Sequence, residues 1–256
     1  MIRCVIESPS VEQFRRLAQS SPWRWTTVEF EFAPSWHTSG VHAWIRRPGS
    51  LRVETADGKI DAVECATIPF AGTMVQYSDG VSRQSEARWP SDVTPKFDTD
   101  GLVSELPCAT DSWLVDWDDP FYQDYRWIAM LNPIELTRSP HDHSSTTTVT
   151  DLSEVEVVEH HGRQAWQVLA RTTDDYIARC ECCPLLSGHY DYEADRWIPG
   201  PPVTVRLDAH SGICVYVGPT PDDPTSDYHL DLSIISVDIQ LDDSLFTRDR
   251  RILRHR

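Results

Sequence analysis

The stretch VTVRLDAHSGICVYV, residues 203–217, decides the fold. In its first half, Val203, Val205 and Leu207 alternate with polar residues, as in a strand that buries one of its faces. The turn AHSG then leads into a second alternating run, which begins at Ile213. Because a short turn joins the two runs, the stretch is predicted to be an antiparallel hairpin.

The same pattern extends outward in both directions. Further alternating runs joined by short turns are predicted as strands over residues 25–32, 41–46, 51–54, 155–159, 164–171 and 230–241. In the last run, the apolar parity changes between Ile234 and Ile235, which predicts a β-bulge. Hairpin connections imply an antiparallel sheet, for which we expect about nine to eleven strands.

Two segments have helical spacing. Residues 11–20 repeat apolar side chains every three or four positions, and Ser10 suits the N-cap. A second helix is predicted to begin at Asp119, which is followed by proline, and to end at Asn132. It is strongly apolar, so we expect it to cover the sheet. Residues 89–110 show no clear period and are expected to form a long loop. The predicted class is α+β.

Composition narrows the classes of function. The chain has 256 residues and a formal net charge of −17, which disfavours nucleic acid as a partner because phosphates need a basic surface. We expect one domain over residues 1–247 and a solvated basic tail over residues 248–256. The sequence contains neither a GxSxG elbow nor the GxxxxGK[ST] and GxGxxG nucleotide motifs. The expectation therefore leans away from an enzyme.

The beginning of the chain carries no secretory pattern. MIRCVIESPSVEQFRRL lacks a basic stretch followed by an apolar one and a cleavage site. No apolar run approaches 18 residues, so no transmembrane helix is expected. With Met1 as the true start, we expect a cytoplasmic protein whose seven cysteines are mostly reduced.

Unusual chemistry is concentrated in YIARCECCPLLSGHYDY, residues 176–192. Cysteine and histidine side chains are the ligands that zinc prefers, so the candidate metal ligands are Cys180, Cys182, Cys183 and His189. Zinc is the one cofactor that we consider. Two alternatives stay open: a disulfide or redox switch, and simple burial of the thiols. The candidate disulfide partners are Cys65, Cys108 and Cys214.

The order of these pieces resembles a known family. The phrases GRQAW, VRLDAHSG and DDSLF are similar to those of the lipoprotein-carrier half-barrel superfamily. It includes the LolA and LolB carriers, LppX-type lipid-binding lipoproteins and the sensor domain of RseB-like regulators. The chain looks most like uncharacterised actinobacterial members that also carry a CxCCPLL stretch. The resemblance covers residues 10–247, and none of its phrases is a catalytic signature.

The resemblance implies a strongly curved antiparallel sheet, a half-barrel, with helices covering its concave face. Such a scaffold would hold a hydrophobic small molecule or lipid, or a protein partner, without catalysis. A solid core under the helices is the alternative interpretation of the same side chains. The residues that we expect on or near the concave face are Phe30, Phe32, Trp44, Tyr77, Trp127, Trp166, Val205 and Ile213.

Two further functions stay open. VioE, an enzyme of violacein biosynthesis, shares the half-barrel, so a small-molecule enzyme on this fold is one alternative; no residue of this chain matches VioE. The other is a thiol- or zinc-dependent regulator that uses the cysteines at positions 180–183. In a half-barrel these cysteines would lie on the connection between two hairpins, at the mouth of the barrel. Nothing in the sequence indicates an oligomeric state.

Overall fold

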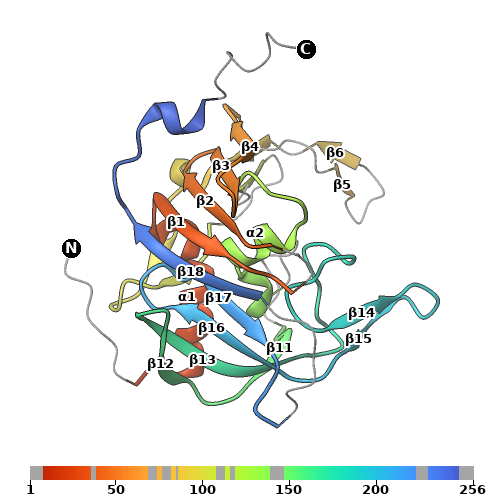
Figure 1. Ribbon diagram of the computed structural model, residues 1–256. Helices are drawn as coiled ribbons and strands as arrows, with labels where there is room; N and C mark the ends of the chain where they lie inside the picture. The colour runs from red at the N-terminus through yellow and green to blue at the C-terminus, as the bar shows by residue number, and fades with distance from the viewer. Residues whose placement is uncertain are drawn as a thin grey trace.

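The computed structural model describes residues 8–35, 39–68, 74–76, 82–84, 86–107, 113–115, 119–138, 147–222 and 230–247. Its main feature is a ten-stranded sheet in which every pairing is antiparallel (Figure 1). The predicted α+β class and the large antiparallel sheet are therefore confirmed.

The main sheet runs in the order β11-β13-β16-β17-β18-β1-β2-β3-β4, and β12 also pairs with β13. The bounds of these strands are β1 (Thr27–Phe32), β2 (Val41–Arg46), β3 (Ser50–Thr55), β4 (Ile60–Cys65), β11 (Thr150–Leu152), β12 (Glu156–His160), β13 (Arg163–Thr172), β16 (Val203–Asp208), β17 (Cys214–Gly218) and β18 (Leu230–Val237).

Four strand pairs lie outside the main sheet: β5 (Met74–Gln76) with β6 (Ser82–Gln84), β7 (Glu86–Arg88) with β10 (Trp113–Val115), β8 (Lys96–Phe97) with β9 (Val103–Glu105), and β14 (Gly188–Asp191) with β15 (Arg196–Pro199). The α-helices of the described residues are α1 (Val11–Arg24) and α2 (Arg126–Leu131). Short 3-10 helices are η1 (Pro90–Asp92), η2 (Ile134–Leu136) and η3 (Asp243–Phe246).

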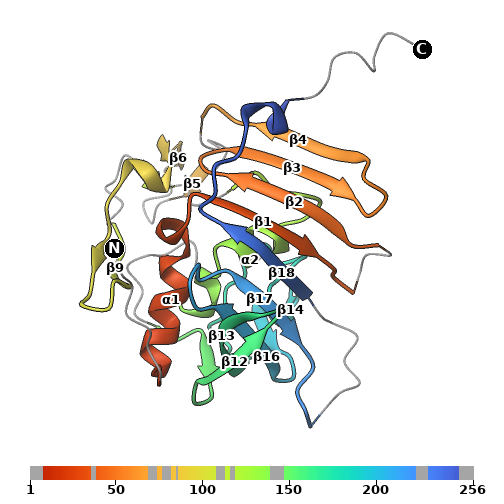
Figure 2. The same cartoon turned by 60° about the vertical axis from the view of Figure 1, so that its left-hand side comes forward.

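The pairing of β1 with β18 joins the two halves of the sheet. Figure 2 shows the strands from β4 to β18 following one another across it. In the register of this pair, Phe30 faces Ile234 and Glu29 faces Ser236, so Ile235 has no partner on β1. The extra residue is a β-bulge, and it confirms the bulge that the change of apolar parity predicts.

One face of the sheet is buried under the helices. Trp127 of α2 packs on Phe30 with ring centroids 5.2 Å apart and on Phe32 at 5.5 Å. Phe14 and Leu17 of α1 are fully buried in the same apolar cluster. At about 25 cal/mol per Å2 of apolar surface, this burial is the main stabilising contribution to the fold.

The hairpin that decides the fold is also the docking site of α1. Asp208 accepts hydrogen bonds from Ser211 N at 2.7 Å and from Arg163 Nε at 2.7 Å, which shapes the turn. Gly212 follows with a φ of +75°, a conformation that glycine adopts without steric cost. A Cβ on Gly212 would lie 2.6 Å from the carbonyl oxygen of Leu17, so α1 approaches the turn too closely for any side chain.

The start of the second helix differs from the prediction. The helix α2 begins at Arg126, and Gln123, with a φ of +68°, interrupts the segment before it. Asp119 is buried and forms two hydrogen bonds with Arg47, at 2.9 and 2.8 Å, instead of capping a helix. The guanidinium of Arg47 also lies 3.2 Å from the ring centroid of Trp25. The acidic residue at position 119 therefore forms an ion pair with a distant segment and does not mark the start of a helix.

The prediction of a long loop over residues 89–110 is wrong in part. This segment contains the β8–β9 hairpin, which packs along α1. Arg16 Nη1 donates to Asp98 at 2.9 Å, and Val103 N donates to the Ser20 hydroxyl at 2.8 Å. Both contacts join this hairpin to α1, which is more than 80 residues away in the sequence, so no local sequence pattern predicts them.

Some expectations fall outside the described residues: Tyr77, Cys108 and the basic tail at 248–256. Within the described part of the chain, none of the helices is long and apolar enough to cross a membrane.

The close contact at Gly212 predicts an unequal effect of two matched substitutions. Gly58 has nearly the same φ, +79°, but a Cβ there would meet nothing within 4 Å. Gly58→Ala is expected to cost only the backbone penalty of about 1–2 kcal/mol. Gly212→Ala should cost a further 1–3 kcal/mol or so, because α1 must move. Urea unfolding of both variants measures the difference, and equal losses would contradict the account.

Candidate functional site

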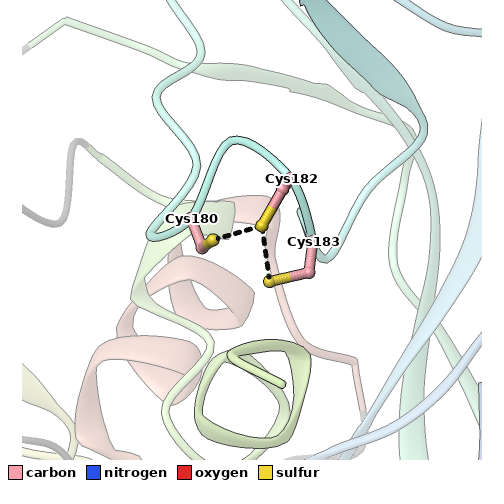
Figure 3. Close-up of side chains that lie close together, drawn as sticks. All are labelled: Cys180, Cys182 and Cys183. Carbon is pink, nitrogen blue, oxygen red and sulfur yellow. Dashed lines mark hydrogen bonds between the residues drawn. The ribbon is translucent and has the colours of Figure 1, made fainter. Parts of the chain in front are cut away.

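Three sulfur atoms meet in one turn of the chain (Figure 3). The Sγ atoms of Cys180 and Cys182 lie 3.0 Å apart, those of Cys182 and Cys183 lie 3.7 Å apart, and all three fall within 4.8 Å of one another. Neighbouring side chains diverge in extended backbone, but here Cys183 N donates to Cys180 O at 3.1 Å and closes a turn. The turn directs all three thiols to one side.

A buried carboxylate holds the two ends of this turn. Glu135, in η2, is 1% exposed. One of its oxygens accepts the N–H of Arg179 and the other accepts the N–H of Leu185, both at 2.8 Å. These residues immediately flank the segment 180–184. Arg126 Nε adds a hydrogen bond to Pro184 O at 3.2 Å, so α2 and η2 together anchor the cysteine turn.

The three thiols differ in acidity. Partial burial of Cys180 opposes its ionisation, but hydrogen bonds with Cys182 and Cys183 more than offset this, so the pKa of Cys180 is lowered. The hydrogen bond with Cys180 raises the pKa of Cys182. Burial raises the pKa of Cys183 to about 12. The arrangement therefore favours a thiolate at Cys180 that accepts hydrogen bonds from its neighbours.

His189, the fourth residue of the predicted metal-ligand set, lies apart from this cluster. It lies on β14, where it pairs with Ile198 of β15, and its ring nitrogens are not among the ligand atoms that gather within 4.8 Å. The sequence pattern missed the β14–β15 hairpin because the runs are short. Trp197 of β15 is buried and donates its indole N–H to Thr172 Oγ1 at 3.0 Å, which fixes the hairpin on β13.

The structure also bears on the disulfide alternative. All the described cysteines are free thiols: Cys65, Cys180, Cys182, Cys183 and Cys214. Cys65 is exposed on β4, whereas Cys214 is fully buried on β17. The Sγ separation of 3.0 Å between Cys180 and Cys182 is well above a disulfide bond of about 2.05 Å.

Most of the residues expected on the ligand-binding face belong to the packed core. The exposed fraction is at most 6% for Phe30, Phe32, Trp127, Trp166, Val205 and Ile213, and all six belong to one cluster. Trp44 faces the other way, because it stacks on His42 at 3.9 Å and alternates with the buried Ala43 and Ile45. Tyr77 lies outside the described residues.

The residue that sequence reasoning missed is Glu135. It stands in the apolar segment that follows α2, between Ile134 and Leu136, both of which are buried. An acidic residue between apolar neighbours signals a carboxylate that needs buried partners. The sequence contains this signal, but it does not show which N–H groups donate to the carboxylate.

Comparisons with known proteins do not add to this picture. No protein-family model matches the chain, and no curated protein is similar to it. The sulfur geometry itself therefore decides what the site could hold. Zinc binds thiolates at about 2.3 Å, so two sulfurs of a tetrahedral centre lie about 3.8 Å apart. The separation of 3.7 Å between Cys182 and Cys183 matches this value, and the Cys180 sulfur would move outward by under 1 Å or so.

The lowered pKa of Cys180 predicts selective alkylation of the metal-free protein. The thiolate is the nucleophile, so modification of Cys180 by iodoacetamide should reach half of its maximal rate at a lower pH than free cysteine does. Cys183, with its pKa raised to about 12, should stay unmodified near neutral pH. Peptide mass spectrometry across the pH range locates the label.

The matched variants are Cys182→Ala and Cys65→Ala. The first removes a hydrogen-bond partner of Cys180, so its alkylation should slow and shift to higher pH. The second removes an exposed thiol outside the cluster and should leave Cys180 unchanged. Preferential labelling of Cys183 would contradict the assignment.

Proposed function

We propose that this chain is a non-catalytic binding protein that acts as a zinc- or thiol-dependent regulator through the cysteine turn. The single observation that supports it is the convergence of three Sγ atoms within 4.8 Å. Soft thiolate ligands select ions such as Zn²⁺ and Cu⁺. Three protein ligands leave one position of a tetrahedral zinc centre for water or for a group of a partner.

The scaffold proposed for this site is the half-barrel of the lipoprotein-carrier superfamily. We propose that the main sheet is strongly curved and that α1 and α2 cover its concave face. Bulges increase the local twist of a sheet, and this one has register shifts in the β1–β18, β3–β4 and β16–β17 pairs. Trp127 of α2 and Leu17 of α1 contribute to one apolar cluster with the sheet, which supports the same arrangement.

The core packing supports a protein partner over a lipid. A carrier of hydrophobic molecules needs space on the face that bears Phe30 and Trp166, but these side chains are at most 3% exposed and pack against other core residues. The cysteine turn, in contrast, reaches solvent: Cys182 is exposed, and nearby Ile177 and Tyr192 are 47% and 73% exposed. A partner would therefore recognise this turn, in its metal-bound or its metal-free form.

The regulatory step proposed is a change in the order of the turn. The hydrogen bonds to Glu135 fix only the two ends of the cysteine turn. In the metal-free protein, only hydrogen bonds between thiols hold the three sulfurs together. A bound zinc ion replaces these weak contacts with three Zn–S bonds and releases thiol protons. The rigid turn then presents one defined surface to the partner.

Zinc titration with a competing chromophoric chelator tests this function. One equivalent of Zn²⁺ should bind to the wild-type chain. Cys180→Ser, Cys182→Ser and Cys183→Ser should each weaken binding by more than about 100-fold, above the 10- to 100-fold cost of losing an outer-sphere partner. Cys65→Ser is the matched control, because Cys65 is also a free thiol but lies on β4, outside the cluster.

The outcome that refutes the metal site is equal zinc affinity of Cys180→Ser and Cys65→Ser. Circular dichroism accompanies each titration, because Cys183 is buried and its replacement could unfold the turn. Cys180 and Cys182 are more accessible, so their variants keep the test valid if Cys183→Ser is unstable.

A further inference from the structure

The cysteine turn contains one pair of thiols that is placed to form a bond. The Sγ atoms of Cys180 and Cys182 lie 3.0 Å apart, so they need to approach by only about 1 Å to reach the disulfide bond length of about 2.05 Å. Cys183 N donates to Cys180 O and closes the turn, which keeps these side chains on the same side of the backbone. The backbone therefore already has a shape that brings the pair together.

Cys183 is less suited to form this bond. Its sulfur lies 3.7 Å from that of Cys182, and the residue is only 5% exposed. The Cys183 thiol also forms a hydrogen bond with the backbone of Tyr125, next to α2. A disulfide between the adjacent residues 182 and 183 would close a ring around a single peptide bond, whose planarity is costly to disturb. We therefore expect the third thiol to stay reduced.

The other two thiols are accessible from solvent. Cys182 is exposed and Cys180 is partly exposed. Peroxides oxidise an accessible thiol to a sulfenic acid, and a second thiol beside it condenses with the sulfenic acid to give a disulfide. Figure 3 shows that the sulfur of Cys182 lies between those of Cys180 and Cys183. Cys180 and Cys182 thus combine access with the shorter of the two sulfur separations.

We infer that a peroxide oxidises Cys180 and Cys182 to a disulfide and that this bond switches the metal site off. The second part rests on the function proposed above. One of the two sulfurs attacks a peroxide oxygen, so an S–O bond forms, the O–O bond breaks and water leaves. The other sulfur attacks the sulfenic acid, so the S–S bond forms, the S–O bond breaks and a second water leaves. The two thiols give up two electrons and two protons, and the peroxide takes them up.

The disulfide removes two of the three zinc ligands. Within the described part of the chain, only Cys183 of the cluster remains, and a zinc centre uses at least three protein ligands. The ends of the turn need not move, because Glu135 holds Arg179 and Leu185, which lie outside the new ring. Bound zinc acts in the opposite direction, since it engages the same sulfurs and protects them from the peroxide. Zinc binding and oxidation therefore exclude each other.

Peptide mapping of the full, metal-free chain tests this inference. The reduced protein is treated with hydrogen peroxide and unfolded, and its free thiols are blocked with iodoacetamide; a second alkylating agent follows reduction. Residues 180–196 form one tryptic peptide, so fragmentation shows which cysteine carries which label. Cys183 should carry the first label, and Cys180 and Cys182 the second. The zinc affinity of the oxidised chain should fall by more than about 100-fold and return after treatment with dithiothreitol.

The variants separate the two ways of pairing the thiols. Cys183→Ser should still form the disulfide, whereas Cys180→Ser and Cys182→Ser should not. Cys65→Ser is the control, because Cys65 is exposed but lies on β4, outside the cluster, and it should be oxidised at the turn like the wild type. The mapping in the wild type does not depend on any variant, so it remains decisive if Cys183→Ser is unstable.

Three results would overturn the inference: three free thiols in the turn after peroxide treatment, a disulfide that includes Cys183, and equal zinc affinity of the oxidised and reduced chains. A reduced wild-type chain that binds no zinc would refute the proposed function and with it the switch. The mapped bond would still decide which thiols pair, so the two failures are distinguishable.

Discussion

The buried carboxylate of Glu135 is the interaction on which the cysteine turn depends. It accepts one backbone N–H from each end of the turn, at Arg179 and Leu185, and it is 1% exposed. Burial raises its pKa, even though both N–H groups oppose that shift. Such a group is tolerated in the core only because its oxygens are satisfied. The turn that carries the three thiols is therefore fixed at both of its ends by Glu135.

This anchor is in turn positioned by the packing of helices on the sheet. Glu135 follows α2, and Trp127 of α2 is fixed against Phe30 and Phe32. The helix α1 also holds α2 in place, because Ser21 Oγ of α1 donates a hydrogen bond to the carbonyl oxygen of Leu131 at 2.6 Å. The same α1 docks on the turn at Gly212. The hairpin, the helices and the cysteine turn are thus linked by consecutive close contacts, although they are far apart in the sequence.

The sequence predicted the parts of the fold that depend on local alternation. Strand β2 covers the predicted residues 41–46, and the unpaired Ile235 lies at the predicted change of parity. It missed the start of α2, because the ion pair of Asp119 with Arg47 is a tertiary contact. It grouped His189 with the three cysteines, whereas the structure places His189 on the β14–β15 hairpin, because spacing along the chain does not show on which hairpin a histidine lies.

X-ray absorption at the zinc edge tests the central claim most directly, because it reports the atoms bound to the metal. For the zinc-loaded protein, the account predicts three sulfur neighbours at about 2.3 Å and one oxygen or nitrogen neighbour at about 2.0 Å. The three sulfurs are those of Cys180, Cys182 and Cys183. A first shell made only of oxygen and nitrogen, or one that contains a single sulfur, would contradict it.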